Sequence, residues 1–243
     1  MGFSRFYCPG ELVADREIEL PEQAAHHASR VLRLKVGAQV TLFNGAGGEY
    51  DASIVSMGKQ GVVVQTGAWS DRECESPLDV TLVQAIPSGE KMDFTLQKAV
   101  ELGVRSIQPV ISSRSVVRLE GERAEKRVQH WQNVVISACE QSGRNRVPTV
   151  GQIMTLNQWF GKNLDAAVKL TLSPRAARRF RELPVPGGTV LFLVGPEGGL
   201  SDAEEGAAAV CGFTSVKLGE RILRTETAAL AAISAMQTLW GDF

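Results

Sequence analysis

The fold is decided by residues 189–204, which read TVLFLVGPEGGLSDAE. Residues 189–194 are apolar or β-branched without alternation, which is typical of a parallel strand buried on both faces. The loop that follows has three glycines in five positions, and glycine allows positive φ and close approach of a ligand to the backbone. Ser201 and Glu204 have the spacing of a capping box, which predicts a helix directly after the loop. Together these features favour a site for a nucleotide-like small molecule, although a tight β–α turn would also fit.

The composition is that of an ordinary globular chain of 243 residues with a net charge of −1. This length supports one or two domains with normal cores. No apolar run approaches the ~20 residues that cross a bilayer, and the N-terminus lacks the apolar region of a signal peptide. The four cysteines are scattered and form no C-x-x-C pair, so we expect a cytoplasmic protein with reduced thiols and no metal site.

Residues 1–72 predict a small β domain. A helix is expected from Pro21 to Leu34, with His26 and His27 as surface or packing residues. Short strands with glycine-rich turns suggest a β-barrel of the OB or PUA kind, a common RNA-binding platform. The helix would turn Ala24, Ala25, Ala28, Val31 and Leu32 to one side, and the strands are expected at 39–43, 49–56 and 61–67.

From residue 73 onward, strands alternate with helices, which predicts a parallel sheet with helices on both faces. Ser173 and Pro174 suggest the cap and first turn of one of these helices. The expected strands are 80–86, 106–111, 166–172, 189–194 and 214–218, and the other helices are 88–102, 122–141, one beginning at 201, and 225–239.

A second ligand-like stretch, KLGERILRTETA, covers residues 217–228. A strand ends at Leu218, and Thr225 is expected to cap the last helix, whose free N–H groups would point toward the loop. This loop and the glycine-rich loop both follow carboxyl ends of strands. We therefore expect them to converge on one pocket.

Arginines gather in three short stretches, at 114–127, 144–146 and 169–181. In a nearly neutral chain they favour a surface that faces phosphate groups, although solvated charge is the alternative. The candidate RNA-binding residues are Arg5, Arg30, Arg33, Arg114, Arg144, Arg146 and Arg175.

Several catalytic motifs are absent from the sequence. It contains no P-loop, no dinucleotide fingerprint on the first strand, no G-x-S-x-G and no H-E-x-x-H. Phosphoryl transfer, nicotinamide redox chemistry, triad hydrolysis and zinc hydrolysis are therefore disfavoured.

The stretches LVGPEGGL at 193–200 and LGERILRTETA at 218–228 resemble the cofactor loops of SPOUT-class methyltransferases. Within that class the chain is similar to the RsmE-type enzymes, which methylate N3 of a uridine in 16S ribosomal RNA. SGEKM at 88–92, KAVELG at 98–103 and ACEQSGRN at 138–145 extend the resemblance over essentially the whole chain. Ser173 departs from the histidine expected in some relatives, which leaves open whether this position contacts ligand.

The resemblance implies a fold that the periodicity does not. A PUA-like β-barrel over 1–72 would precede a SPOUT α/β domain over 73–243, whose C-terminal segment forms a trefoil knot. It also implies S-adenosylmethionine as cofactor, a homodimer, and the decoding region of 16S rRNA in the assembled small subunit as substrate, with no membrane and no metal.

The resemblance further implies roles for individual residues. Arg224 would stabilise negative charge that develops on the uracil oxygens, with a salt bridge to Glu226 or Glu197 as its alternative role. Glu226 is a possible base, although a helix N-terminus favours its ionised form. The residues expected to bind cofactor are Leu172, Gly195, Pro196, Glu197, Gly198, Gly199, Leu218, Gly219, Ile222, Leu223, Thr225, Thr227 and Ala228.

Two other functions stay open at this point. One is an enzyme that uses a different adenine nucleotide, which NAD binding would favour. The other is a non-catalytic RNA-binding or ribosome-assembly factor, which RNA binding without methyl transfer would favour.

Overall fold

The computed structural model describes residues 3–58, 61–117, 119–162 and 164–243. The chain divides into two compact units. Unit 1 comprises Met1–Glu75 and Cys139–Val147, and unit 2 comprises Ser76–Ala138 and Pro148–Phe243. The chain therefore leaves unit 1, builds part of unit 2, and returns to unit 1 through residues 139–147, which we call the return segment.

Unit 1 is built on a five-stranded sheet with the order β1-β3-β4-β5-β2. The predicted strands at 39–43, 49–56 and 61–67 are present, and the last two are longer than expected. Residues of β5 alternate between buried and part-exposed positions, as a strand with one face on a core requires. The strands are β1 (Ser4–Tyr7), β2 (Glu17–Glu19), β3 (Gln39–Phe43), β4 (Glu49–Gly58) and β5 (Gly61–Ser70).

The helix expected from Pro21 to Leu34 is shorter and changes its winding. α1 (Glu22–His26) is followed by a π-helical turn, η1 (His27–Val31). In that turn the N–H of Leu32 donates to the carbonyl of His27, five residues back. The wider turn shifts the faces of the following residues, so Val31 and Leu32 are 61% and 40% exposed instead of joining the buried alanines.

The return segment is joined to unit 1 by polar contacts. The guanidinium of Arg144 donates to both carboxylate oxygens of Glu75, at 3.0 and 2.6 Å, and both side chains are buried. Asn145 Nδ2 donates to the carbonyl of Arg72 at 2.6 Å. Glu140 accepts a hydrogen bond from the N–H of Tyr7 at 3.0 Å. These contacts make residues 139–147 a structural part of the N-terminal unit.

Unit 2 contains a parallel sheet with the order β12-β10-β11-β6-β7-β8, in which β9 also pairs with β7. Every residue of β11 is buried, as its unalternating apolar sequence predicted. The trefoil knot implied by the resemblance stays a prediction. The strands are β6 (Val80–Ala85), β7 (Ser106–Ile111), β8 (Thr149–Val150), β9 (Met154–Thr155), β10 (Val168–Leu172), β11 (Val190–Val194) and β12 (Thr214–Val216).

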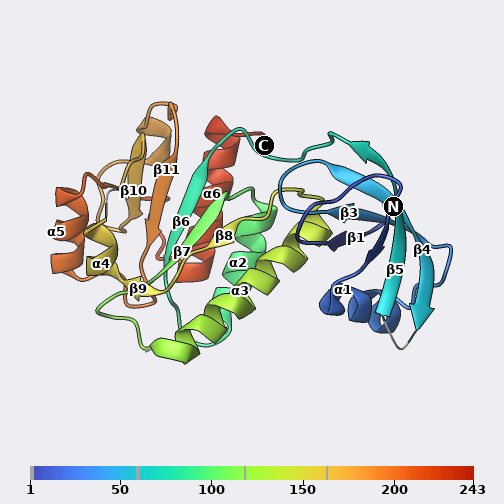
Figure 1. Ribbon diagram of the computed structural model, residues 1–243. Coiled ribbons are helices and arrows are strands. Elements are labelled where there is room, and N and C mark those ends of the chain that lie inside the picture. Colours follow the sequence, from blue (N-terminus) through green and yellow to red (C-terminus); the bar gives the residue numbers. More distant parts are fainter. Residues whose placement is uncertain (1–2, 59–60, 118, 163) are drawn as a thin grey trace. The chain divides into compact units, whose positions relative to one another are not determined.

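Helices cover both faces of this sheet (Figure 1). On one face, α4 and α5 pack over a core that includes Val83 and Leu193. On the other face, α6 packs against α2 and β11. The helices are α2 (Lys91–Glu101), α3 (Gly121–Ser142), α4 (Leu156–Phe160), α5 (Asp202–Val210) and α6 (Thr225–Trp240), with a 3-10 turn, η2, at Phe180–Glu182.

The structure corrects two expectations about helix starts. No helix begins at Ser173, because its hydroxyl donates to Glu205 Oε1 at 3.3 Å and residues 174–177 form only a turn and a bend. Thr225 does not cap α6, whose N-cap is Arg224. By contrast, the capping box of Ser201 and Glu204 is confirmed at the start of α5.

Candidate functional site

The two ligand-like loops meet at the carboxyl ends of the strands. The glycine loop (residues 195–200) follows β11, and the arginine loop (residues 217–224) connects β12 to α6. The hydroxyl of Thr225, at the start of α6, donates to the carbonyl of Gly195 at 2.6 Å. The convergence that the sequence predicted is therefore a direct contact between the end of one loop and the start of the other.

Glu197 anchors the glycine loop to the segment between β6 and α2. Its Oε1 accepts from Ser88 N at 3.0 Å, Ser88 Oγ at 2.6 Å and Lys91 Nζ at 2.7 Å. Partial burial disfavours the ionised carboxylate, but the hydrogen bonds from Lys91 and Ser88 outweigh it and lower the pKa of Glu197 to about 2. Glu197 is thus held ionised by the protein itself. The SGEK stretch of the sequence was the signal that could have located Ser88 and Lys91.

Arg114 holds the same loop from the segment between β7 and α3. Its Nη1 donates to the carbonyls of Gly198 and Leu200, at 2.8 and 3.2 Å. The neighbouring Ser113 donates through its N–H and hydroxyl to the buried carboxylate of Glu204, at 2.7 and 2.8 Å. Sequence reasoning assigned Arg114 to RNA, whereas the structure places its guanidinium on the glycine loop.

The three glycines of the loop have steric reasons of their own. A Cβ on Gly195 would lie 3.0 Å from Leu200 N, and one on Gly198 would lie 3.3 Å from the side chain of Arg114. Gly199 has a φ of +68°, which disfavours other residues. Packing accounts for Gly195 and Gly198, and backbone conformation accounts for Gly199, so the glycines alone do not indicate a ligand.

Unpaired buried polar atoms give an independent indication. Among the described residues of unit 2, the buried side-chain atoms without a hydrogen-bond partner are Gln84 Oε1, Thr171 Oγ1 and Glu226 Oε2. They lie next to the carboxyl ends of β6 and β10 and in the first turn of α6. Thr171 is in register with Leu193, which faces α4 and α5, so Thr171 lies on the opposite face of the sheet from Gln84. Gln84 is hydrogen-bonded to Thr225, the residue before Glu226. Buried polar groups are normally paired, so the unpaired atoms of Gln84 and Glu226 beside the loops suit a polar ligand. Sequence reasoning missed Gln84 and Thr171, which have no motif around them.

Arg224, the predicted catalytic residue, is exposed at the N-cap of α6, directly before Thr225. Within the described parts of the chain it forms no ion pair with Glu226 or Glu197, so the alternative salt-bridge role has no support. The other predicted cofactor residues of this region differ in exposure. Leu172, Leu218, Gly219, Leu223 and Ala228 are half-buried, Pro196 is buried, and Ile222 and Thr227 are exposed.

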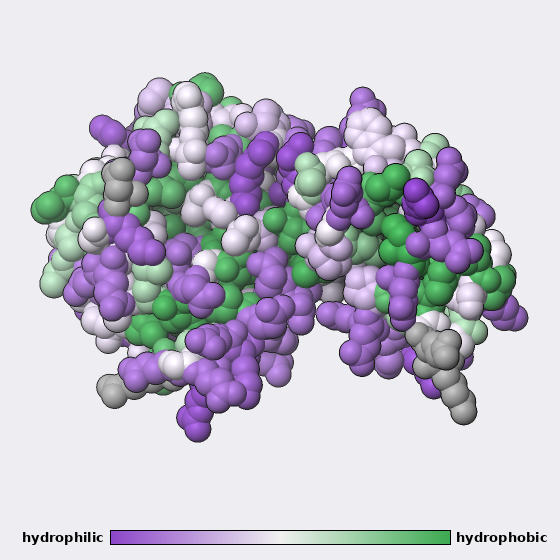
Figure 2. All heavy atoms as spheres, viewed as in Figure 1, coloured by the Kyte–Doolittle hydropathy of each residue, from purple (hydrophilic) through white to green (hydrophobic). Residues whose placement is uncertain are grey.

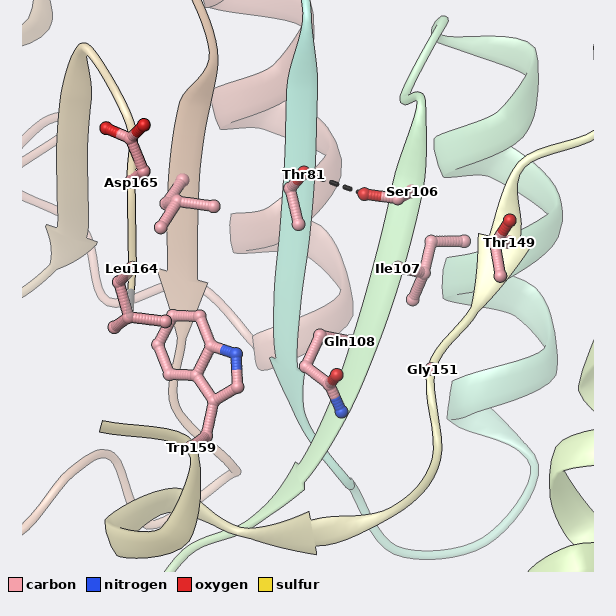
Figure 3. A pocket seen from close by; sticks show the side chains of 10 residues that line it. Thr81, Ser106, Ile107, Gln108, Thr149, Gly151, Trp159, Leu164 and Asp165 are labelled. Atoms are coloured by element: carbon pink, nitrogen blue, oxygen red, sulfur yellow. Dashed lines mark hydrogen bonds between the residues drawn. The ribbon is translucent and has the colours of Figure 1, made fainter. Parts of the chain in front are cut away.

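A cavity of about 250 Å³ lies elsewhere on the sheet (Figure 3). It is lined by Thr81 and Ser106, whose hydroxyls are 2.7 Å apart, and by Trp159 from α4. These strand residues belong to the amino-terminal halves of β6 and β7, away from the strand ends that carry the loops. The cavity is therefore separate from the candidate site.

The predicted RNA-binding arginines fall into two groups. The structure corrects the expectation for Arg144, whose side chain is buried in an ion pair with Glu75. Arg5 is half-buried, and its guanidinium is already paired with Glu49. Arg30 and Arg33 are exposed, Arg146 is half-exposed beside Glu73, and Arg175 is exposed with Asp202 and Glu205 as partners. Figure 2 also shows hydrophilic residues gathered over α3.

In the part of the chain that the structure describes, no helix is long and apolar enough to span a bilayer. Nor do His, Cys, Asp and Glu side chains there form a group of three or more that could hold a metal ion.

Comparison with known proteins gave consistent matches. Residues 74–237 match the model of a family described as an RNA methyltransferase domain, and residues 20–66 match an RNA methyltransferase PUA domain. The ribosomal RNA small subunit methyltransferase E of Buchnera aphidicola subsp. Acyrthosiphon pisum (strain APS) is 32% identical, over 98% of this chain and 94% of that protein. The protein of the same name from Bacillus subtilis (strain 168) is 32% identical, over 88% of this chain and 87% of its own length.

Solved structures agree over the full length. The ribosomal RNA small subunit methyltransferase E from Neisseria gonorrhoeae, bound to S-adenosyl methionine, has a TM-score of 0.93 and 46% identity and covers 100% of both chains. A Legionella pneumophila protein in complex with the same cofactor has a TM-score of 0.97 and 40% identity, again covering 100% of both chains.

Proposed function

Because the chain belongs to the family of ribosomal RNA small subunit methyltransferase E, we propose that it transfers a methyl group from S-adenosylmethionine to N3 of one uridine in the decoding region of 16S rRNA. The observation that carries the proposal is the contact of Thr225 with Gly195, which joins two strand-end loops beside the unpaired atoms of Gln84 and Glu226. The same two loops carry the family resemblance in the sequence.

The residues at the strand ends fit this cofactor. S-adenosylmethionine offers hydrogen-bond donors and acceptors on its adenine, ribose and amino-acid parts, and the unpaired atoms of Gln84 and Glu226 beside the loops are available to polar groups. Leu172, the glycine loop and residues 218–228 would hold it. When bound, the cofactor supplies an electrophilic methyl group. The contribution of the protein is then largely to position the two substrates.

The uracil must be made nucleophilic at N3. That nitrogen is a weakly acidic imide, so it loses a proton while negative charge develops on the two uracil oxygens. Arg224 is exposed beside the loops, and a guanidinium is suited to stabilise this charge. Glu226, in the first turn of α6, is the candidate acceptor of the proton.

The substrate surface would use the exposed arginines. Arg30 and Arg33 lie in unit 1, which contains the PUA match, and Arg146 and Arg175 are also accessible. Phosphate contacts of this kind position RNA without reading its sequence. We therefore assign the choice of uridine to the assembled small subunit, whose shape the protein would recognise.

A homodimer is part of the proposal. α2 and α6 pack together, and each exposes a large apolar side chain, Phe94 at 49% and Leu239 at 44%. Covering such side chains on association is favourable. Light scattering on the purified protein tests this, and a monomer at micromolar concentration would contradict it.

The reaction is tested on small subunits purified from a strain that lacks the enzyme. Incubation with methyl-labelled S-adenosylmethionine should label 16S rRNA, and the product should stop reverse transcriptase one nucleotide before a single site. The stop arises because N3 methylation removes the donor used in Watson–Crick pairing. The proposal would be contradicted if this protein left the 16S rRNA unlabelled while a related enzyme labelled it in the same subunits.

A further inference from the structure

Gln84 is a buried amide in the central part of the parallel sheet. It lies next to the end of β6, between β11 and β7, and is 0% exposed. Its Nε2 donates to the carbonyl of Ala85 at 2.9 Å and to the hydroxyl of Thr225 at 3.1 Å. Its Oε1 has no partner. An apolar side chain of similar size would fill this space without an unpaired acceptor, so packing does not explain the choice of glutamine.

Thr225 continues the chain of hydrogen bonds. A hydroxyl has one proton to donate and lone pairs to accept with. Since Thr225 Oγ1 accepts from Gln84, its proton is free to go to the carbonyl of Gly195, 2.6 Å away. Thr225 is 5% exposed, so water does not readily replace either bond. Gln84 in the strand therefore donates to Thr225 in the helix, and Thr225 donates to Gly195 in the loop.

We infer that Gln84, Thr225 and the carbonyl of Gly195 form a latch that sets the glycine loop against the N-terminus of α6. Gln84 and Thr225 are then positioning residues for the cofactor, an inference that rests on the proposed function. The latch joins the first residue of the glycine loop to the residue that follows Arg224. It therefore controls the spacing of the two loops and the place of the proposed catalytic arginine.

Substitutions at position 225 test the hydroxyl, and Thr225→Val does so at nearly the same side-chain volume. Thr225→Val removes the hydroxyl, and Thr225→Ser keeps it. Thr238→Val is the matched control, because Thr238 lies on the same helix and its hydroxyl donates to the carbonyl of Ser234 at 2.9 Å, far along the chain from the loops. The binding of S-adenosylmethionine is measured by calorimetry, and folding by thermal unfolding.

Thr225→Val should weaken cofactor binding roughly 5- to 150-fold, which corresponds to about 1–3 kcal/mol for a buried hydrogen-bonding group left unpaired. Thr225→Ser should stay within about threefold of wild type, and Thr238→Val should not differ from it. Unchanged affinity in a folded Thr225→Val protein would overturn the latch. Absence of binding by the wild-type protein would instead overturn the proposed function, and with it the premise of the latch.

Gln84→Met is a second test of the latch, and it applies even if Thr225→Val does not fold. Methionine is close in volume and introduces no unpaired acceptor, so the melting temperature should be kept while cofactor affinity falls. A lower melting temperature with unchanged affinity would show that Gln84 is structural only. The double variant Gln84→Met, Thr225→Val should bind no worse than the weaker single variant, because both interrupt one chain. Additive losses of cofactor affinity in the double variant would overturn the latch.

Discussion

Arg114→Ala separates two roles for an exposed arginine, a clamp on the glycine loop and a contact to RNA phosphate. In the structure its Nη1 donates to the carbonyls of Gly198 and Leu200 at 2.8 and 3.2 Å. A hydrogen bond to a charged group contributes about 1.5–3 kcal/mol, and water can replace part of this at an exposed site. We take the lower value, ~1.5 kcal/mol, which predicts about tenfold weaker binding of S-adenosylmethionine.

The assay pairs calorimetry of cofactor binding with a salt titration of RNA binding. Losing a phosphate contact reduces the slope of log K against log salt concentration by about one. Arg114→Ala should leave this slope unchanged, because the guanidinium bonds to carbonyls of its own chain. Arg30→Ala, at an exposed arginine of unit 1, is the matched control. It should reduce the salt slope of RNA binding and leave cofactor affinity unchanged. Normal cofactor affinity with a reduced slope for Arg114→Ala would refute the clamp.

Three further predictions concern the same region. Gly198→Val should weaken cofactor binding at least tenfold, about 1.4 kcal/mol, because the new side chain would press on Arg114 carbons that lie 3.3 Å from a Cβ at this position. Gly206→Ala is the control and should not weaken binding, because a Cβ there meets no other atom within 4 Å. Equal affinities of the two variants in calorimetry would contradict this prediction. Arg224→Ala should lower the single-turnover rate by ~10²–10³ with cofactor affinity changed less than about threefold, and the opposite pattern would make Arg224 a cofactor ligand. Ionised Glu197 should stabilise the fold above its ordinary pKa of 4.5, and this contribution should be lost as the pH falls toward its folded pKa of about 2. The urea midpoint of Glu197→Gln should therefore depend less on pH between 4.5 and 2 than that of the wild type. The same pH dependence of the urea midpoint in both proteins would count against the anchoring role of Glu197.

Local patterns in the sequence predicted the parts of the fold that depend on local physics. The burial of β11 followed from an apolar run without alternation, and the start of α5 from the spacing of Ser201 and Glu204. The family resemblance carried by the two C-terminal loops is confirmed by matches over nearly the whole chain. The pairing of these loops was predictable because both follow carboxyl ends of parallel strands.

The features that sequence reasoning missed depend on tertiary contacts. β8 and β9 have two residues each, too few to show periodicity. Arg144 read as part of a basic cluster, but its partner Glu75 is distant in sequence, so the buried ion pair could not be foreseen. The hydroxyl of Thr225 was predicted to cap its own helix, but it donates to the carbonyl of Gly195 instead. In each case a distant group decided between two locally acceptable arrangements.

The return segment has a consequence for the order in which the protein matures during synthesis. Residues 1–75 are made first, yet the carboxylate of Glu75 and the backbone N–H of Tyr7 bond to residues in 139–147. Ribosomes add about 5–20 residues per second, so the 72 residues between 75 and 147 take roughly 4–14 s to make. During that interval the nascent N-terminal unit lacks the arginine that neutralises its buried carboxylate. The part of the chain that is made first is therefore not the first to be completed, and a gene fragment that ends at residue 75 encodes an unfinished domain.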